Sequence, residues 1–238
     1  MLEVRGVNVH FGGVHAVREV DVSCDAGQIT GLIGPNGAGK TTLFNVITGL
    51  QEATTGSVTL DGEDLTLLPP HKRARRGVAR TFQRLEVFGS LSAYENILTS
   101  AEIRKSWAHD HSDPGRVTDE LVDRVGLAPV AHHRVDAMPT GLARLVELAR
   151  ALAQRPKVLL LDEPASGLDD RETEAFARLL VELAGEGTAI LIVEHDVALV
   201  MRVCQWINVL DFGAIIATGT AEEIQRNQAV LDAYLGAT

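Results

Sequence analysis

The segment GPNGAGKTT, residues 34–42, decides the fold of this chain. It matches the pattern G-x-x-x-x-G-K-[ST], a glycine-rich loop whose backbone amides cradle phosphate groups between a strand and a helix. The flanking sequence fits that context, because QITGLIG (28–34) is a short apolar run typical of a strand and TTLFNVITGL (41–50) has helical periodicity. A glycine-rich turn that matched by chance would lack both neighbours. The sequence therefore predicts a phosphate-binding loop.

Individual residues of this loop have separate expected roles. Gly34, Gly37 and Gly39 allow backbone amides to converge on the phosphates, and the following helix adds its positive N-terminal end. We expect Lys40 to reach the β- and γ-phosphates of ATP and Thr41 to offer its hydroxyl to Mg²⁺. The rest of the predicted nucleotide-binding set in the loop is Asn36, Ala38 and Thr42.

A second chemical signal is VLLLDEP (158–164), an apolar run that ends in two adjacent carboxylates. Buried apolar strands seldom end in paired acids unless a cation or a reaction uses them. We expect Asp162 to hold Mg²⁺ through water, and Glu163 to orient or deprotonate the attacking water. The alternative is an acidic strand end in solvent, which the phosphate loop upstream makes the weaker interpretation.

The pattern along the chain separates β-rich segments from one helical segment. Residues 2–24 alternate apolar and polar around a glycine-containing turn, and GSVTLDG (56–62) reads as a strand closed by Asp-Gly, so both predict antiparallel strands. Residues 91–155 lack strand patterning. They predict helices at 92–105, 117–126 and 140–154, broken by DPG at 113–115 and by Pro129.

The last third of the chain predicts a strand–helix–strand unit. PKVLLLDE (156–163) and TAILIVEH (188–195) are continuous apolar runs, as expected for parallel strands buried on both faces, and an amphipathic helix at 171–187 lies between them. INVLDFGAIIATG (207–219) predicts a hairpin, and EEIQRNQAVLDAYLG (222–236) predicts one closing helix.

Composition bounds the class of protein. The chain has 238 residues, of which 45% are hydrophobic, which fits one large domain or a core domain with an inserted subdomain. A net charge of −10 argues against a nucleic-acid partner. Two cysteines, Cys24 and Cys204, are too few for a disulfide framework and indicate a reducing compartment. With no signal-peptide pattern and no apolar run near the roughly 18 residues of a span, we expect membrane association only through a partner.

Three further surface features are ambiguous from sequence. We interpret the basic run HKRARR (71–76) as a solvated helix face. In LEVFGSL (85–91), Leu85, Val87 and Phe88 indicate either the edge of a groove for a partner helix or ordinary packing, and the two interpretations weigh equally. Four histidines lie in predicted loops, and for them we favour solvated loops over a metal site. They are His109, His111, His132 and His133.

Further short motifs identify a family. RTFQ (80–83) resembles the Q-loop, SGLD (166–169) the D-loop, EHD (194–196) the switch-histidine region and HFGG (10–13) the adenine-stacking loop of the ABC ATPases. Each string is weak alone, but their order and intervals are strong evidence. Nearly the whole chain therefore resembles the ATP-binding subunit of an ABC transporter.

The resemblance implies roles for five more residues. Phe11 would stack on adenine with Val17 in support, Gln83 would approach Mg²⁺ and the attacking water, and His195 would hydrogen-bond the γ-phosphate. Asp169 is added to the predicted nucleotide-binding residues because it belongs to the segment that resembles the D-loop. Without the family match, Phe11 would be read as a core aromatic and His195 as a polar strand end.

The segment MPTGLARLVELARAL (138–152) stands where the family has its LSGGQ signature. Pro139, Thr140 and Leu142 replace Ser, Gly and Gln, and Gly141 is retained. In the family this helix start meets the γ-phosphate bound by the opposite subunit, so the resemblance implies a head-to-tail dimer with two shared sites. A helix N-terminus with open amides suits that task, and proline costs little there.

The resemblance narrows to the ATPases of branched-chain amino-acid importers, a branch of which has a signature near LPYGQ. FGGVHAV (11–17), RLEVFGSLSAYENIL (84–98) and AYLG (233–236) also resemble that branch. Thr140 and Leu142 differ even from the LPYGQ signature of that branch. This difference concerns how well the signature supports ATP turnover, and it does not concern the fold. We favour a subfamily variant over decay because the other chemical residues are present: Lys40, Gln83, Asp162, Glu163, Asp169 and His195.

The phosphate loop and the acidic strand end predict an α/β P-loop NTPase, and the resemblance implies a RecA-like core of ABC ATPase type. Residues 1–238 would form one ATP-binding domain, with residues 1–88 and 156–238 as the nucleotide-binding core and its antiparallel β subdomain, and residues 89–155 as an inserted helical subdomain that carries the signature. It would bind ATP and Mg²⁺, pair with itself or a paralogue, and dock under permease subunits on the cytoplasmic face of the membrane. A solute-binding protein would be an indirect partner.

Three alternatives stay open at this point. The chain is a nucleotide-gated subunit that hydrolyses poorly beside a better paralogue, or it serves another ABC system, for urea or for lipopolysaccharide export. A soluble ABC ATPase of DNA repair or translation is the third, although such proteins carry a long coiled-coil insertion or two fused cassettes.

Overall fold

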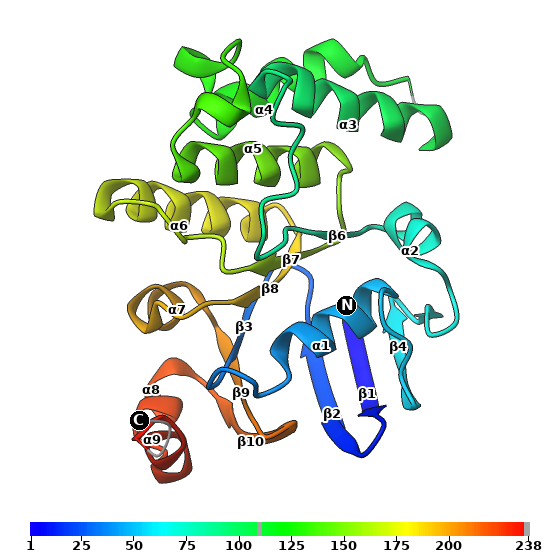
Figure 1. The fold of residues 1–238 in the computed structure, drawn as a ribbon, viewed down its shortest axis with the longest axis vertical. Coiled ribbons are helices and arrows are strands. Elements are labelled where there is room, and N and C mark those ends of the chain that lie inside the picture. The colour runs from blue at the N-terminus through cyan, green and yellow to red at the C-terminus, as the bar shows by residue number, and fades with distance from the viewer. Residues whose placement is uncertain (109–110, 236–238) are drawn as a thin grey trace.

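Two β-sheets form the framework of the protein, of which the computed structural model describes residues 1–108 and 111–235 (Figure 1). The first sheet is antiparallel, in the order β2-β1-β4-β5, with bounds β1 Leu2–Phe11, β2 Val14–Cys24, β4 Thr55–Leu60 and β5 Glu63–Asp64. The second has the order β10-β9-β3-β8-β7-β6, with bounds β3 Ile29–Ile33, β6 Val78–Arg80, β7 Val158–Asp162, β8 Ala189–Val193, β9 Trp206–Asp211 and β10 Ala214–Gly219. Its strands from β9 to β6 are parallel, and β10 is an antiparallel edge strand.

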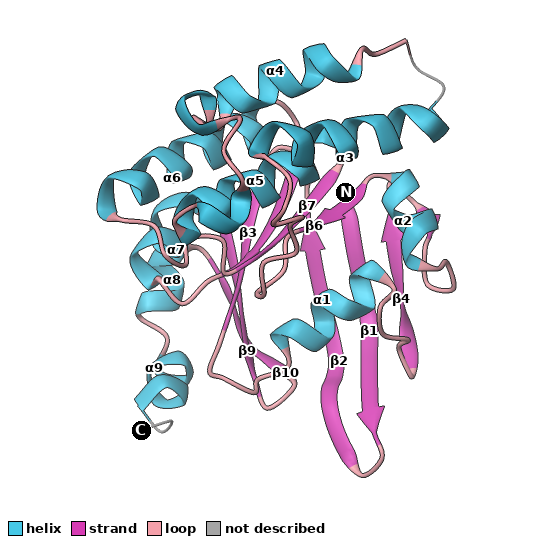
Figure 2. Ribbon diagram, turned by 45° about the horizontal axis from the view of Figure 1, so that its top comes forward, coloured by secondary structure: helices cyan, strands magenta, loops and turns pink. Residues whose placement is uncertain are grey.

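The helices lie mainly on one side of the second sheet. Their bounds are α1 Lys40–Thr48, α2 Pro70–Arg76, α3 Ala93–Ala108, α4 Pro114–Arg124, α5 Thr140–Ala153, α6 Asp170–Gly185, α7 Val197–Val203, α8 Ala221–Gln225 and α9 Gln228–Leu235, with 3₁₀ turns at Ala128–Val130 and Val135–Ala137. In Figure 1, α3, α4 and α5 stack together above α6. Figure 2 shows α1 beside β1 and β2, on the opposite side of the molecule from that stack.

The second sheet separates two hydrophobic cores, because successive side chains of a strand point to opposite faces. In β7, Leu159 and Leu161 pack into the core with the helices, whereas Val158 and Leu160 pack into the core with α1 and the antiparallel sheet. All five residues of β7 are buried, as are those of β3 and β8. The predictions of buried parallel strands and of an N-terminal antiparallel pair are confirmed.

The parallel strands place the chemical segments at one edge. Strands β3, β7 and β8 are hydrogen-bonded neighbours, and the loops that follow them begin with Gly34, Glu163 and Glu194. Because carboxyl ends of parallel strands meet at the same edge of a sheet, ligands of such folds bind there. The fold thus brings segments more than 100 residues apart into one neighbourhood.

Two predicted helix limits are wrong for local reasons. The helix expected at 117–126 begins at Pro114, because Asp113 caps it by accepting a hydrogen bond from the Gly115 amide (3.0 Å) and proline is favoured in the first turn. The single helix expected at 222–236 is two helices, and Asn227 caps the second by accepting from the Ala229 amide (2.9 Å). His109 and the end of the AYLG motif lie outside the described residues.

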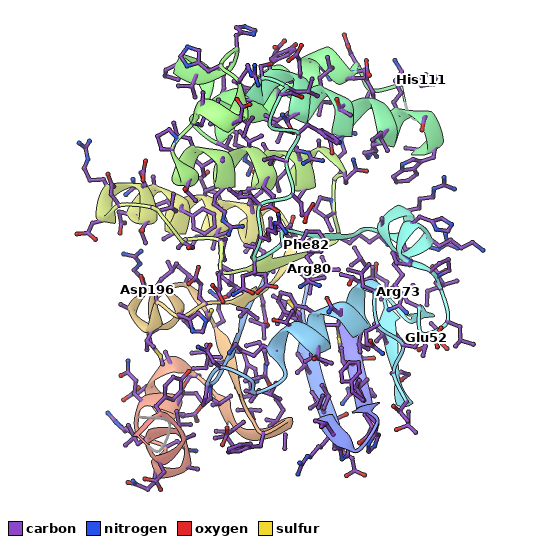
Figure 3. The ribbon with its side chains drawn as sticks, in the orientation of Figure 1. Glu52, Arg73, Arg80, Phe82, His111 and Asp196 are labelled. Carbon is purple, nitrogen blue, oxygen red and sulfur yellow. The ribbon has the colours of Figure 1, made fainter. Side chains whose placement is uncertain are left out.

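The solvated helix face predicted for HKRARR is wrong at Arg73, which is buried (Figure 3). Its guanidinium donates to the carbonyls of Val46 (2.6 Å), Ile47 (2.9 Å) and Leu68 (2.7 Å). Val46 and Ile47 belong to the last turn of α1, whose carbonyls have no partner within the helix. Arg73 therefore closes the C-terminal end of the helix that follows the phosphate loop, and burial lowers its pKa.

No helix among the described residues is both long and apolar enough to cross a membrane.

Candidate nucleotide-binding and hydrolysis site

A cavity of about 530 Å³ lies at the loop edge of the parallel strands. It collects residues from six separate segments of the chain. The predicted site residues that line it are Asn36, Gly37, Ala38, Gly39, Lys40, Thr41, Thr42, Gln83, Glu163 and His195. Val14, His15, Arg18 and Phe212 also line it, although the sequence analysis assigned them no role.

Lys40 lies at the start of α1 and is buried. Its ammonium donates to the carbonyls of Gly34 (2.7 Å) and Pro35 (2.9 Å). Burial lowers the pKa of Lys40, and the nearby charges of Glu163 and Asp162 oppose that shift. The ammonium thus donates to two neutral carbonyls of the loop, from which an incoming phosphate can take its hydrogen bonds.

Glu163 is the point at which three distant segments meet. Its Oε1 accepts a hydrogen bond from the Gln83 side-chain amide (3.0 Å) and lies 2.9 Å from Nε2 of His195. The backbone of Glu163 is in the left-handed region (φ 50°), which is rare outside glycine and marks stored strain. Its amide is fixed by donation to the Val193 carbonyl (2.8 Å). This carboxylate is therefore oriented from three sides and can accept a proton from a water molecule.

Asp162 is buried and has a cationic partner that the sequence analysis missed. Nη2 of Arg80 lies 2.8 Å from its Oδ2, and Nη1 of Arg80 donates to the side chain of Asn45 (2.6 Å). The guanidinium lies against the rings of Phe44 (5.3 Å) and Phe82 (4.8 Å), and Figure 3 shows Arg80 next to Phe82. A lone arginine at the end of an apolar strand is the signal that could have identified it.

The donor set fits Mg²⁺ chemically. Magnesium prefers oxygen ligands such as hydroxyl, amide and carboxylate groups. Thr41 and Gln83 line the cavity and supply the first two. The third kind, a carboxylate, is present in Asp162, which is buried and fixed by its ion pair with Arg80.

The signature helix α5 holds the segment that contains Gln83. Arg144 donates to the carbonyls of Phe82 and Gln83, and Glu147 accepts from the Phe82 amide (3.0 Å). Arg144 and Glu147 also pair with each other (3.1 Å), and burial raises the pKa of Glu147. A buried ion pair that also binds the backbone of another segment holds that segment in position. The sequence contained a signal for this ion pair, because RLVE (144–147) places Arg144 and Glu147 three residues apart on one face of a helix.

Glu194 is a second buried carboxylate that the sequence analysis missed. It accepts hydrogen bonds from the amides of Ala165 (2.7 Å) and His195 (3.0 Å), and burial raises its pKa. It therefore ties the loop that follows Glu163 to the loop that carries His195. An acid between an apolar strand and a histidine was the available signal.

Several predicted residues do not line the cavity. Phe11 is about half exposed (49%) at the end of β1, and Val17 is fully buried, so it can act only from beneath. Gly34 and Asp162 are also buried. Asp169 instead caps α6, where its side chain accepts from the Glu172 amide (2.8 Å).

Gly141 is buried against its own chain. A Cβ atom there would lie 2.9 Å from the side chain of Leu168 and 3.0 Å from the carbonyl of Gly167. The glycine is therefore required by the close approach of the signature helix to the segment that precedes Asp169. Thr140, the first residue of α5, is exposed beside it.

Comparison with protein-family models gives two matches. Residues 17–166 match a model described as ABC transporter. Residues 214–238 match a model described as branched-chain amino acid ATP-binding cassette transporter.

Full-length similarity extends to curated bacterial proteins. The chain is 39% identical to the high-affinity branched-chain amino acid transport ATP-binding protein BraF of Pseudomonas aeruginosa, over 99% of this chain and 98% of that protein. It is 36% identical to LivG of Escherichia coli, which has the same description, over 99% of this chain and 98% of that protein. It is 37% identical to the lipopolysaccharide export system ATP-binding protein LptB of Haemophilus influenzae, over 92% of this chain and 90% of that protein.

Solved structures share the whole fold. A nucleotide-free ATP-binding cassette from an ABC transporter matches with a TM-score of 0.87 and 28% identity, over 98% of each chain. A dimeric bacterial ABC transporter cassette matches with a TM-score of 0.83 and 25% identity, over 93% of this chain and 99% of that one. The predicted fold class is confirmed.

Proposed function

This chain belongs to the ABC transporter ATPase family, and we propose that it is the ATP-hydrolysing subunit of an importer for branched-chain or other amino acids. As a member of that family it binds nucleotide and couples ATP hydrolysis to transport. The family match at residues 214–238 and the full-length similarity to BraF and LivG support the solute class.

The proposal for hydrolysis depends on one observation: the side chains of Gln83 and His195 both contact the Glu163 carboxylate. Lys40 exchanges its two carbonyl partners for phosphate oxygens when ATP enters, because charge-assisted bonds to phosphate are stronger. Glu163 then takes the proton of the attacking water, while the side-chain amide of Gln83 keeps its carboxylate in position. His195 is half exposed, so it is free to turn toward the γ-phosphate.

The same residues define the role of the metal. Thr41, Gln83 and Asp162 would hold Mg²⁺. Bound there, the ion would neutralise negative charge on the phosphates. The part of Arg80 is to hold the buried Asp162 carboxylate in place by their ion pair, because a buried carboxylate without a partner is strongly destabilised.

The site is completed by a second subunit in this proposal. Gly141 and Asp169 do not line the cavity of their own chain, although the family resemblance gives both a role at the nucleotide. Supplied by the opposite subunit, they would meet ATP across a head-to-tail interface. ATP binding then closes the dimer, and hydrolysis reopens it. The partner is a second copy of this chain or a paralogue.

A groove beside the Q-loop supports docking to a permease on the cytoplasmic face of the membrane. It has a volume of about 350 Å³ and is lined by Phe82, Glu86 and Arg150 among others. Phe88, five residues after Gln83, is 47% exposed. The guanidinium of Arg150, which lines the groove, lies 4.7 Å from the centre of the Phe88 ring. Leu85 and Val87, by contrast, pack against the core. The partner interpretation is therefore supported for Phe88 alone.

Uptake by intact cells tests the solute class. Cells that lack this chain should lose uptake of labelled leucine, isoleucine or valine, and the wild-type gene should restore it while a Glu163→Gln gene should not. Uptake that persists in the deletion contradicts the importer. Urea uptake and assembly of lipopolysaccharide in the outer membrane are measured in the same cells, and loss of either would favour that alternative system.

The poorly hydrolysing subunit is the second candidate, because Thr140 and Leu142 depart from the family signature. Turnover of the purified chain is compared with that of its mixture with a paralogous ATPase from the same genome. Activity that appears only in the mixture would favour the nucleotide-gated subunit. Equal turnover per site in both samples would favour the self-sufficient ATPase.

A further inference from the structure

The turn between β9 and β10 breaks a local rule of hairpin sequence. Asp211 and Ala214 pair across it, so Phe212 and Gly213 are its two central residues. Both have positive φ, 41° and 83°. Hairpin turns with two left-handed residues favour Asn-Gly or Asp-Gly, because bulky residues seldom adopt that conformation.

Another hairpin of the same chain provides a direct comparison. Strands β4 and β5 are joined by Asp61 and Gly62, with φ values of 52° and 81°. The φ angles of the two turns are similar, and the β4–β5 turn has the preferred Asp-Gly pair. The phenylalanine at 212 is therefore not a requirement of the turn.

Core packing does not explain Phe212 either. Its side chain is 79% exposed, and a large apolar group in water contributes little to folding. Phe212 thus combines a strained backbone with an exposed aromatic ring, and this combination suggests a functional role.

The turn is fixed to the nucleotide site on two sides. The Gly213 amide donates to the Ala38 carbonyl in the phosphate loop (2.9 Å), and the Gly213 carbonyl accepts from the Arg18 amide in β2 (2.7 Å). A Cβ atom on Gly213 would lie 2.8 Å from the Ala16 carbonyl, so the contact needs glycine. The position of Phe212 relative to the phosphate loop is thus set by backbone contacts.

Phe212 lines the same cavity as Lys40 and the phosphate loop, with Val14 and His15 from the β1–β2 hairpin. Phe11, the aromatic residue expected to stack on adenine, is not among the residues that line it. A nucleotide whose phosphates occupy the loop extends its ribose and base away from Lys40. Phe212 is the only aromatic ring of the described residues, apart from the imidazoles of His15 and His195, that borders this cavity.

We propose that Phe212 is a base-contacting residue of the nucleotide site, additional to Phe11, whose ring packs on the adenine or ribose of bound ATP. This inference rests on the proposed ATP-binding function. An aromatic face suits a nucleobase, and such contacts contribute through stacking without demanding particular hydrogen bonds.

The competing role for Phe212 is support of the C-terminal helix. The residue also lines a second cavity, of about 540 Å³, with Ala229, Asp232 and Ala233 of α9. In that role its loss would lower the stability of the fold and leave nucleotide affinity intact.

Phe212→Asn separates the two roles, because asparagine is preferred at this backbone conformation and should keep the turn. Affinities for ATP, ADP and inorganic tripolyphosphate are measured by calorimetry, with thermal unfolding in parallel. We expect ATP and ADP to bind roughly 3- to 10-fold more weakly. Tripolyphosphate, which has no base, should bind as it does to the wild type.

Two further variants serve as controls. Phe212→Tyr keeps the ring and should bind ATP as tightly as the wild type does. Leu67→Asn removes the most exposed large apolar side chain of the described residues (94%), which does not line the cavity, and should leave all three affinities unchanged.

The possible outcomes are distinct. Unchanged ATP affinity in Phe212→Asn overturns the inference, as does an equal loss for tripolyphosphate, which would mean that the turn only shapes the phosphate loop. A lower unfolding temperature with unchanged nucleotide affinity favours the C-terminal helix. If the wild-type chain itself fails to bind ATP, the proposed function fails, whereas normal wild-type binding confines a negative result to Phe212.

Discussion

The phosphate-loop half of the site and the signature segment differ in how much of their chemistry one chain contains. Around Glu163, residues from three loops meet within hydrogen-bonding distance, and the cavity they border includes Lys40. The start of α5 borders no part of that cavity. Its glycine, Gly141, is buried against Leu168 of the same chain, and only Thr140 beside it is exposed.

This difference indicates that one chain can position the residues around Glu163 without contributing its own signature segment to the same cavity. The clamp of Arg144 and Glu147 connects the two regions, because it joins the signature helix to the backbone of Phe82 and Gln83. A helix whose first residue is exposed and whose side chains hold the Gln83 segment can transmit the approach of a partner to that segment. We therefore propose that the half of the site around Glu163 carries out catalysis and that the signature of a second subunit completes it.

The largest effect should follow a change at Glu163. Glu163→Gln keeps the shape of the side chain and the loop that binds phosphate, but it removes the base. Turnover should fall about 10²- to 10⁴-fold while ATP affinity is retained. The variant should accumulate as an ATP-bound dimer on size exclusion. Turnover equal to that of the wild type would show that another group activates the water.

A smaller loss is expected at the signature, where the structure changes the choice of substitution. Aspartate at Gly141 would collide with Leu168 in the same chain, so it cannot report on the partner. Thr140→Asp places the charge on an exposed first residue of α5, where the helix dipole favours it. Repulsion from the partner's γ-phosphate should lower turnover roughly 10- to 100-fold.

The control for this prediction is Thr140→Ser, which keeps the hydroxyl and should hydrolyse at nearly the wild-type rate. ATP affinity of the monomer and the unfolding temperature should be similar in wild type and both variants. A Thr140→Asp protein with full turnover would mean that the segment is only a helix start.

The docking prediction concerns a partner and not the chemical step. Phe88→Asp should abolish pull-down by the permease and leave basal hydrolysis intact, because Phe88 is half exposed and does not line the nucleotide cavity. Val87 packs against the core, so its substitution would test folding. Leu67→Asp is the matched control, and retention of the permease by Phe88→Asp would contradict the groove.

The smallest effect is expected at Leu142, which is partly buried beside the core. Leu142→Gln restores the commoner family residue and should leave turnover unchanged or raise it by less than about threefold, as a partly exposed substitution typically changes energies by a few tenths of a kcal/mol. A large loss would show that this apolar contact supports the signature helix.

Sequence reasoning identified what is local and missed what depends on contacts between distant segments. The phosphate loop and the paired acids of β7 are contiguous patterns with a fixed mechanism, and the structure has Lys40, Gln83, Glu163 and His195 around one cavity. The binding roles of these residues remain predictions.

Arg73, Arg80 and Glu194 were missed because each is a charged residue in a context typical of the surface. Their burial depends on carbonyls, amides and a carboxylate that other segments bring near them. The helix limits were wrong at Asp113 and Asn227 for a related reason, since both side chains cap helices that periodicity alone places elsewhere or merges.

The central claim, that each site joins the catalytic half of one subunit to the signature of another, is tested most directly by mixing two inactive variants. Glu163→Gln disables the catalytic half and Thr140→Asp the signature. In a head-to-tail dimer of one copy of each, one site has two disabled halves and the other has none. An equimolar mixture should therefore regain roughly a quarter of wild-type ATPase activity. Activity no higher than the average of the two separate variants would contradict the claim.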